Sequence, residues 1–125
     1  TLVTPHAGEF LRLGGNPGAD RLAAASALAG ELNCIVVLKG HETCITDGTV
    51  HYINPTGNPG MAVGGSGDLL AGMMTALRGQ KLAPLEAAAA GVWLHGKAGD
   101  LAADRLGQYA MLPSDMLDEL PRLLK

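Results

Sequence analysis

The chain has 125 residues, of which 47% are hydrophobic, 17% charged and only 3% aromatic. This composition is typical of one folded domain whose core is built from small and aliphatic side chains, and it argues against disorder. The net charge is −3 and no cluster of Lys or Arg occurs, so nucleic acid is not expected as a partner.

The beginning of the chain predicts a short strand and a short helix. Residues 2–4 are expected to be extended, because a residue that precedes a proline, here Pro5, avoids the helical region. Residues 7–13 then predict a helical turn, which Gly14 and Gly15 end.

A helix, a buried strand and a hairpin are expected next. The alanine-rich segment Ala19–Leu32 predicts a helix. The apolar run Cys34–Lys39 is typical of a strand buried on both faces of a parallel sheet. Asp47-Gly48 lies between two β-prone runs and predicts a two-residue hairpin turn. Cys34 and Cys44 lie in apolar runs without metal-ligand spacing, so we expect buried free thiols in a cytoplasmic protein.

The remainder of the chain predicts a loop followed by three helices. Residues 54–67 are rich in Pro and Gly and form a loop, after which a helix runs from Asp68 to Gly79. Pro84 opens a second helix with a stripe of mostly small residues. A short last helix is expected to be capped by Ser114 or Asp115.

This order of elements indicates an α/β layered domain, because strands alternate with helices. Few parallel strands can be counted, so the sheet looks incomplete and we expect residues 1–125 to be the later part of a larger domain. No apolar run reaches the length of a membrane span, and the first residues lack the layout of a secretory signal.

The segment "GGSGD", Gly64–Asp68, carries the strongest chemical signal. Glycines let a ligand lie against the backbone, and the amides of Gly65, Ser66, Gly67 and Asp68 would point outward at the head of a helix. The helix dipole there favours a neighbouring anion by about 0.3–1 kcal/mol. No Gly-Lys-Ser/Thr follows, and the third glycine of a dinucleotide fingerprint is missing, so neither standard phosphate loop is present.

Asp68 has two interpretations. It would be an ordinary first-turn acid, which stabilises a helix start. However, a carboxylate beside an anion site repels the anion. Its presence makes chemical sense if it accepts a proton from a hydroxyl that attacks a phosphoryl group.

Three separated segments resemble one known family over almost the whole chain. "GGSGDLLAG", "TPHAGEFLRL" and "VLKGHETCITDG" are similar to motifs of the ADP- or ATP-dependent NAD(P)H-hydrate dehydratases, members of the ribokinase-like superfamily. Ser66 stands where many relatives carry threonine. The resemblance implies a layered α/β/α fold of which residues 1–125 form the C-terminal part.

The resemblance also implies an activity, namely the repair of the hydrated cofactors NADHX and NADPHX. ADP or ATP would phosphorylate the ring hydroxyl, after which phosphate leaves and the ring double bond returns. Mg²⁺ is expected to accompany the nucleotide, and no protein metal cage is expected. A homo-oligomer, namely a tetramer, and an epimerase domain fused upstream are further implications.

Site residues follow by the same resemblance. Asp68 is expected to be the catalytic base and to touch the substrate, and His6 to contact the hydrated nicotinamide. Gly65, Ser66 and Gly67 would form an anion hole. The nucleotide would be bound by Gly67 and by Lys39, Gly40, His41, Glu42 and Thr43, largely through the backbone of the latter.

Several of these residues have a structural alternative. Lys39 would be a solvated charge at a strand end, and His6 a turn residue. Glu9 is expected to brace the turn rather than to catalyse. His95 and Asp100 are taken as structural, with His95 buried and hydrogen-bonded. Asn54 and Asn58 suit adenine or ribose recognition and equally suit bracing of a tight loop.

Two other functions stay open. One is a ribokinase-like kinase for a vitamin precursor alcohol, which would share the glycine-rich loop and Asp68. The other is a truncated module that binds nucleotide without chemistry. The segments "TPHAGE" and "KGHET" favour the dehydratase over the kinase.

Overall fold

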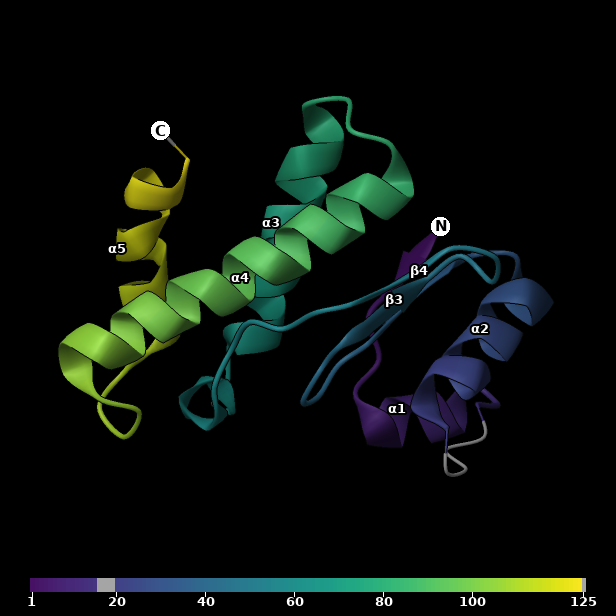
Figure 1. The fold of residues 1–125 in the computed structure, drawn as a ribbon, viewed down its shortest axis with the longest axis horizontal. Helices are drawn as coiled ribbons and strands as arrows, with labels where there is room; N and C mark the ends of the chain where they lie inside the picture. The colour runs from purple at the N-terminus through teal and green to yellow at the C-terminus, as the bar shows by residue number, and fades with distance from the viewer. Residues whose placement is uncertain (16–19, 125) are drawn as a thin grey trace.

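The computed structural model describes residues 1–15 and 20–124 and shows a layered α/β arrangement (Figure 1). Its elements in chain order are β1 (Leu2–Val3), α1 (Ala7–Arg12), α2 (Arg21–Leu32), β2 (Ile35–Leu38), β3 (Cys44–Thr46), β4 (His51–Ile53), the 3-10 helix η1 (Pro59–Met61), α3 (Ser66–Gly79), α4 (Pro84–Leu106) and α5 (Pro113–Leu123). The expected strands, hairpin and helices are therefore present.

The four strands form one sheet in the order β1-β2-β3-β4. β2 is parallel to β1, with Leu2 opposite Ile35, and antiparallel to β3, with Val37 opposite Ile45. β2 is buried along its whole length, as expected. β2 was predicted to lie in a parallel sheet, but only its neighbour β1 is parallel to it. Its other neighbour, β3 of the β3-β4 hairpin, is antiparallel.

Alternation along β2 gives each face of the sheet its own core. Val36 and Leu38 pack with Phe10 of α1 and Leu28 of α2 on one face. Ile35, Val37 and Ile45 pack on the other face against Leu70 and Met74 of α3 and Ala88 and Val92 of α4. The sheet therefore lies between two helical layers, the arrangement that places loops from several elements at one end of the sheet (Figure 1).

α4 extends beyond the sheet and carries α5 at its far end (Figure 1). Met111 and Met116 pack there against Ala98 and Ala102 of α4. The buried Glu119 carboxylate accepts hydrogen bonds from Arg105 Nε at 2.9 Å and Arg122 Nη1 at 3.2 Å. The bond from Arg105 is the main reason why the pKa of Glu119 lies below its ordinary value.

Two predicted helix starts need correction. α3 begins at Ser66 rather than Asp68, because Gly65 adopts the left-handed conformation (φ 93°) and serves as the N-cap without a side chain. α5 is capped by neither Ser114 nor Asp115. Leu112 is its N-cap residue, and Asp115 accepts a hydrogen bond from the Leu112 amide at 2.7 Å.

Two further boundaries differ from expectation. α2 begins at Arg21 with Asp20 as its cap, and Ala19, the predicted first residue, lies outside the described residues. The hairpin has four residues between Thr46 and His51 rather than two. The Asp47 carboxylate stabilises this longer turn by accepting hydrogen bonds from the amides of Thr49 and Val50, each at 2.8 Å.

Cys34 and Cys44 are buried free thiols, as predicted. Burial raises the pKa of the Cys44 thiol. Within residues 1–15 and 20–124, no helix has both the length and the hydropathy that a membrane crossing requires.

Candidate functional site

A cavity of about 850 Å³ opens where the loops at one end of the sheet meet α3 and α4. Its wall includes the segment between β2 and β3, the loop after β4, the head of α3 and one face of α4. Most of the predicted site residues line it together: His6, Lys39, Gly40, His41, Glu42, Thr43, Asn54, Asn58, Ser66 and Gly67. Gly65 and Asp68 adjoin these residues along the chain without lining the cavity.

The head of α3 presents backbone donors. Gly65 turns the chain into the helix, and the Leu69 amide already bonds the Gly65 carbonyl at 3.0 Å. The Ser66 amide donates to the Val63 carbonyl at 3.3 Å, so it is partly used. Within the described part of the chain, the amides of Gly67 and Asp68 have no acceptor. These two donors, with the helix dipole behind them, form a ready site for an anion.

Asp68 is exposed and is the acidic residue of the first turn of α3. Among residues 1–15 and 20–124, no hydrogen bond or ion pair holds its carboxylate, and α3 has no side-chain cap. Asp68 is therefore not used as a capping group. Its carboxylate is available to a ligand that reaches the head of α3.

Lys39 brings a positive charge to the same place. It follows β2 directly, is half-buried and lines the cavity. A Cβ atom added to Gly67 would lie 3.1 Å from the Lys39 Nζ, so the ammonium group lies against the first turn of α3. This position differs from that of a freely solvated lysine, and the ammonium adds a positive charge beside the free amides of α3.

His95 of α4 supports the head of α3 from the protein interior. Its Nε2 lies 2.9 Å from the Ser66 carbonyl oxygen and 3.3 Å from the Ser66 Oγ. A carbonyl oxygen only accepts, so Nε2 carries a proton and donates it to the Ser66 carbonyl. Burial is the main cause that lowers the pKa of His95. His95 thus has the buried, hydrogen-bonded position that the sequence predicted.

The low pKa of His95 makes stability pH-dependent. The unfolded chain binds a proton on this ring near pH 6.5, whereas the folded protein resists it, so stability falls as the pH drops below that value. We expect His95→Gln, which can keep the bond to Ser66, to flatten this fall. Denaturant unfolding between about pH 7 and pH 5 measures this change in the free energy of unfolding. His51→Gln, at an exposed position on β4, should leave the slope unchanged, and equal slopes for both variants would contradict the expectation.

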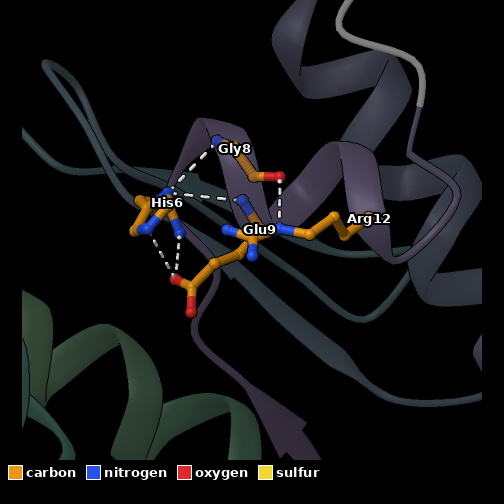
Figure 2. Close-up of polar contacts among 4 residues, drawn as sticks. All are labelled: His6, Gly8, Glu9 and Arg12. Carbon is orange, nitrogen blue, oxygen red and sulfur yellow. Dashed lines mark hydrogen bonds and ion pairs between the residues drawn. The ribbon is translucent and has the colours of Figure 1, made fainter.

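His6 acts as the N-cap of α1 (Figure 2). Its Nδ1 accepts from the amides of Gly8 at 3.1 Å and Glu9 at 3.3 Å, and Glu9 Oε1 accepts from the His6 amide at 3.1 Å. That bond is the main cause that lowers the pKa of Glu9. Glu9 therefore braces the turn, as expected. His6 is both a capping residue and part of the cavity wall, and its Nε2 lies 3.4 Å from Glu9 Oε1.

Asn54 and Asn58 brace the loop after β4. Asn54 Nδ2 donates to the Thr56 carbonyl at 3.0 Å. Asn58 Oδ1 accepts from the Gly60 amide, and its Nδ2 donates to Asp100 of α4, each at 3.0 Å. Loop bracing, one of the two roles expected for these amides, is thus observed, and Asp100 has the structural role that was predicted.

Thr56 and Gly96 are among the cavity residues that were not anticipated from the sequence. Thr56 Oγ1 lies 3.0 Å from the Trp93 carbonyl oxygen of α4 and 3.0 Å from Asn54 Oδ1. A Cβ atom on Gly96 would lie 2.1 Å from that hydroxyl oxygen, so the loop can touch the helix only because residue 96 is glycine. A glycine inside an alanine-rich helix costs about 1 kcal/mol, which was the available signal.

Within the described residues, no group of three or more His, Cys, Asp or Glu side chains is arranged to hold a metal ion. The free amides of α3, the Lys39 ammonium and the exposed Asp68 carboxylate together offer anion binding with a carboxylate beside it.

Comparison with known proteins points to one family. The family model described as NAD(P)H-hydrate dehydratase matches residues 1–122. A bifunctional NAD(P)H-hydrate repair enzyme of Moorella thermoacetica is 52% identical over 130 residues, which cover 99% of this chain and 24% of that protein.

Solved structures agree with the observed fold. The ADP/ATP-dependent NAD(P)H-hydrate dehydratase of Bacillus subtilis, co-crystallised with ATP and Mg²⁺, superposes with a TM-score of 0.91 at 35% identity, covering 98% of this chain and 46% of that one. A ribokinase-like superfamily protein of Enterococcus faecalis gives a TM-score of 0.86 at 35% identity, with 98% and 43% covered. The chain thus spans about a quarter of the Moorella protein and less than half of either structure.

Proposed function

Because the chain belongs to the NAD(P)H-hydrate dehydratase family and has a ribokinase-like fold, we propose that it takes part in nucleotide-dependent dehydration of NADHX and NADPHX. ADP or ATP donates a phosphoryl group to the ring hydroxyl of the hydrated nicotinamide. Phosphate then leaves and the ring double bond returns, while ADP is converted to AMP or ATP to ADP. The co-crystallised nucleotide of the Bacillus subtilis relative supports nucleotide use.

One observation carries this proposal. The unused amides of Gly67 and Asp68 at the head of α3 lie beside the cavity that the segment Lys39–Thr43 also lines. A polyphosphate held at this place would meet backbone donors on one side and the Lys39 ammonium on another. Preorganised donors at a transferring phosphoryl group contribute on the order of 3 kcal/mol each to the transition state.

Each predicted site residue has a role in this arrangement. The segment Lys39–Thr43 and Gly67 bind the nucleotide, with Asn54 and Asn58 as further candidates on the loop after β4. Gly65 sets the backbone conformation that points the amides outward. The Ser66 amide is the weaker donor for a ligand, because it already donates to the Val63 carbonyl. Asp68 accepts the proton of the attacking hydroxyl, and His6 contacts the nicotinamide portion.

Magnesium fits this site as a companion of the nucleotide. Mg²⁺ is commonly bound through one or two carboxylates and the phosphates of the substrate rather than by a protein cage. In this proposal Asp68 accepts a proton, so Mg²⁺ would be held through the phosphates of the nucleotide and water. The ion would neutralise phosphate charge.

The proposal extends to the larger protein. We regard residues 1–125 as the C-terminal part of a ribokinase-like domain in a cytoplasmic homo-oligomer, namely a tetramer. The name of the Moorella relative, a bifunctional repair enzyme, supports a second activity in some family members, and a fused epimerase domain is our proposal for it.

An absorbance assay tests the dehydratase function. The full polypeptide that carries this chain is mixed with NADHX, ADP and Mg²⁺, and the reduced-nicotinamide absorbance band is followed over time. We expect the band to return only when ADP or ATP is present. If the band does not return although calorimetry detects ADP binding, the dehydratase function is refuted and the chain is a module that binds nucleotide without chemistry. Phosphorylation of a vitamin precursor alcohol without any return of the band would identify the kinase.

A further inference from the structure

Arg21, the first residue of α2, reaches across to the segment Lys39–Thr43 from the layer opposite α3 and α4. Its Nη1 donates to the His41 carbonyl at 2.8 Å. Its Nη2 lies 3.2 Å from the Leu38 carbonyl and 3.2 Å from the Lys39 carbonyl. One planar guanidinium thus holds three carbonyl oxygens, and a fork of this kind fixes both the distance and the orientation of what it binds.

Gly40 makes this close contact possible. A Cβ atom at this position would lie 3.0 Å from Arg21 Nη2 and 3.6 Å from its Cζ, so the guanidinium lies directly against the backbone. Gly40 also has a positive φ of 149°, and Glu42 has a φ of 55°, which a residue with a side chain seldom adopts. Glycine tolerates its φ at position 40, whereas Glu42 is held in a conformation that its surroundings must maintain.

The carbonyls bound by Arg21 determine where the following amides point. A trans peptide is planar, so its N–H points away from its C=O. The Lys39 and His41 carbonyls face Arg21, so the amides of Gly40 and Glu42 face away from α2. Within the described part of the chain neither amide has an acceptor, and both residues line the cavity.

Other contacts keep the intervening carbonyls occupied as well. Thr43 Oγ1 donates to the Gly40 carbonyl at 3.0 Å, and the Cys44 Sγ lies 3.6 Å from the Glu42 carbonyl. Among residues 1–15 and 20–124, no ion pair engages Arg21, so its charge is balanced by carbonyl dipoles. The guanidinium is committed to the shape of this segment rather than to a partner carboxylate.

We propose that Arg21 is a positioning residue for nucleotide binding, which fixes the segment Lys39–Thr43 so that the amides of Gly40 and Glu42 donate to the nucleotide. The inference rests on the proposed function, because it takes the cavity as the nucleotide site. Arg21 itself does not touch the ligand. It lowers the cost of binding by ordering the donors beforehand.

Calorimetry of ADP binding tests this role in the full polypeptide that carries the chain. Arg21→Met keeps the aliphatic stem and removes the fork, and it should weaken ADP binding roughly 10- to 100-fold. Arg21→Lys keeps a cation without the planar fork, so its ADP affinity should lie between those of the parent and Arg21→Met. Arg78→Met is the matched control, because Arg78 also bonds a carbonyl, that of Leu82, far from the cavity; its ADP affinity should stay within about twofold.

Kinetics separate positioning from a general structural role. If Arg21 acts through the segment, KM for ADP rises in Arg21→Met while kcat at saturating ADP and KM for NADHX stay within about twofold. ADP affinity within about twofold of the parent overturns the inference, as does a parallel loss of ADP affinity, NADHX affinity, kcat and thermal stability. If Arg21→Met does not fold, the same criteria apply to Arg21→Lys.

The outcomes for the parent protein keep the two proposals apart. A parent that fails to bind ADP refutes the proposed function and the role of Arg21 together. A parent that binds ADP but does not dehydrate NADHX refutes the dehydratase alone, and the affinities of the variants then still decide the role of Arg21. Dehydration in the parent combined with unchanged ADP affinity in Arg21→Met refutes only the role of Arg21.

Discussion

Asp68→Asn, made in the full polypeptide, is expected to lower turnover of NADHX at least about 100-fold while ADP affinity is retained. An asparagine amide has nearly the shape of the carboxylate but cannot accept a proton from the attacking hydroxyl. The backbone amides of Gly67 and Asp68 stay in place, so the anion site survives. Turnover at saturating ADP and ADP binding by calorimetry measure the two quantities separately.

Glu86→Gln is the matched control for Asp68→Asn. Glu86 is the acidic residue in the first turn of α4, so its replacement also removes a negative charge that interacts with a helix dipole, but it does not line the cavity. We expect turnover near that of the parent. Equal losses of binding and turnover in Asp68→Asn would instead mean that Asp68 has a structural role.

Gly96→Ala is expected to cost about 1–3 kcal/mol of stability, although alanine is the better helix former by about 1 kcal/mol. The added methyl group would lie 2.1 Å from Thr56 Oγ1 and 2.8 Å from the Thr56 carbonyl carbon, and the backbone there cannot move aside cheaply. The loop after β4 must shift away from α4. Because that loop forms one wall of the cavity, ADP affinity should fall as well.

Gly72→Ala provides the comparison for Gly96→Ala. Gly72 lies in the middle of α3, and nothing lies within 4 Å of the Cβ atom that alanine would add. This variant should be more stable than the parent by up to about 1 kcal/mol and should bind ADP normally. Denaturant unfolding of both variants measures the difference. A Gly96→Ala protein as stable as Gly72→Ala would show that the contact between Thr56 and α4 is loose.

The two effects test different parts of the same site. The first tests the proposed chemistry at the head of α3, whereas the second tests the contact between the loop after β4 and α4. The structure adds Lys39 to the first part, because its ammonium lies against Gly67 in the first turn of α3. A positive charge at this place would attract an anion bound by the amides at the head of α3.

Several elements of the fold could be predicted because their signals are local. Such signals are the apolar run at β2, the turn residues after β3 and the small-residue stripe of α4. Each is a pattern of residues that are close together in the sequence. Helix starts were less predictable. Gly65 caps α3 by its backbone conformation, and Leu112 precedes α5 while Asp115 bonds back to it, so neither start carries the usual side-chain signal.

The sequence by itself determined the alternation of strands and helices, the glycine-rich turn before α3 and the family, because periodicity and motifs are properties of neighbouring residues. Only the tertiary structure decided that Arg21 meets the carbonyls of Lys39 and His41, that His95 meets Ser66, and that Gly96 meets Thr56. These contacts join residues 18 to 40 positions apart, whose side chains carry no mutual signal along the chain. They arise where separate layers pack, and packing fixes the distances between groups that the chain order leaves free.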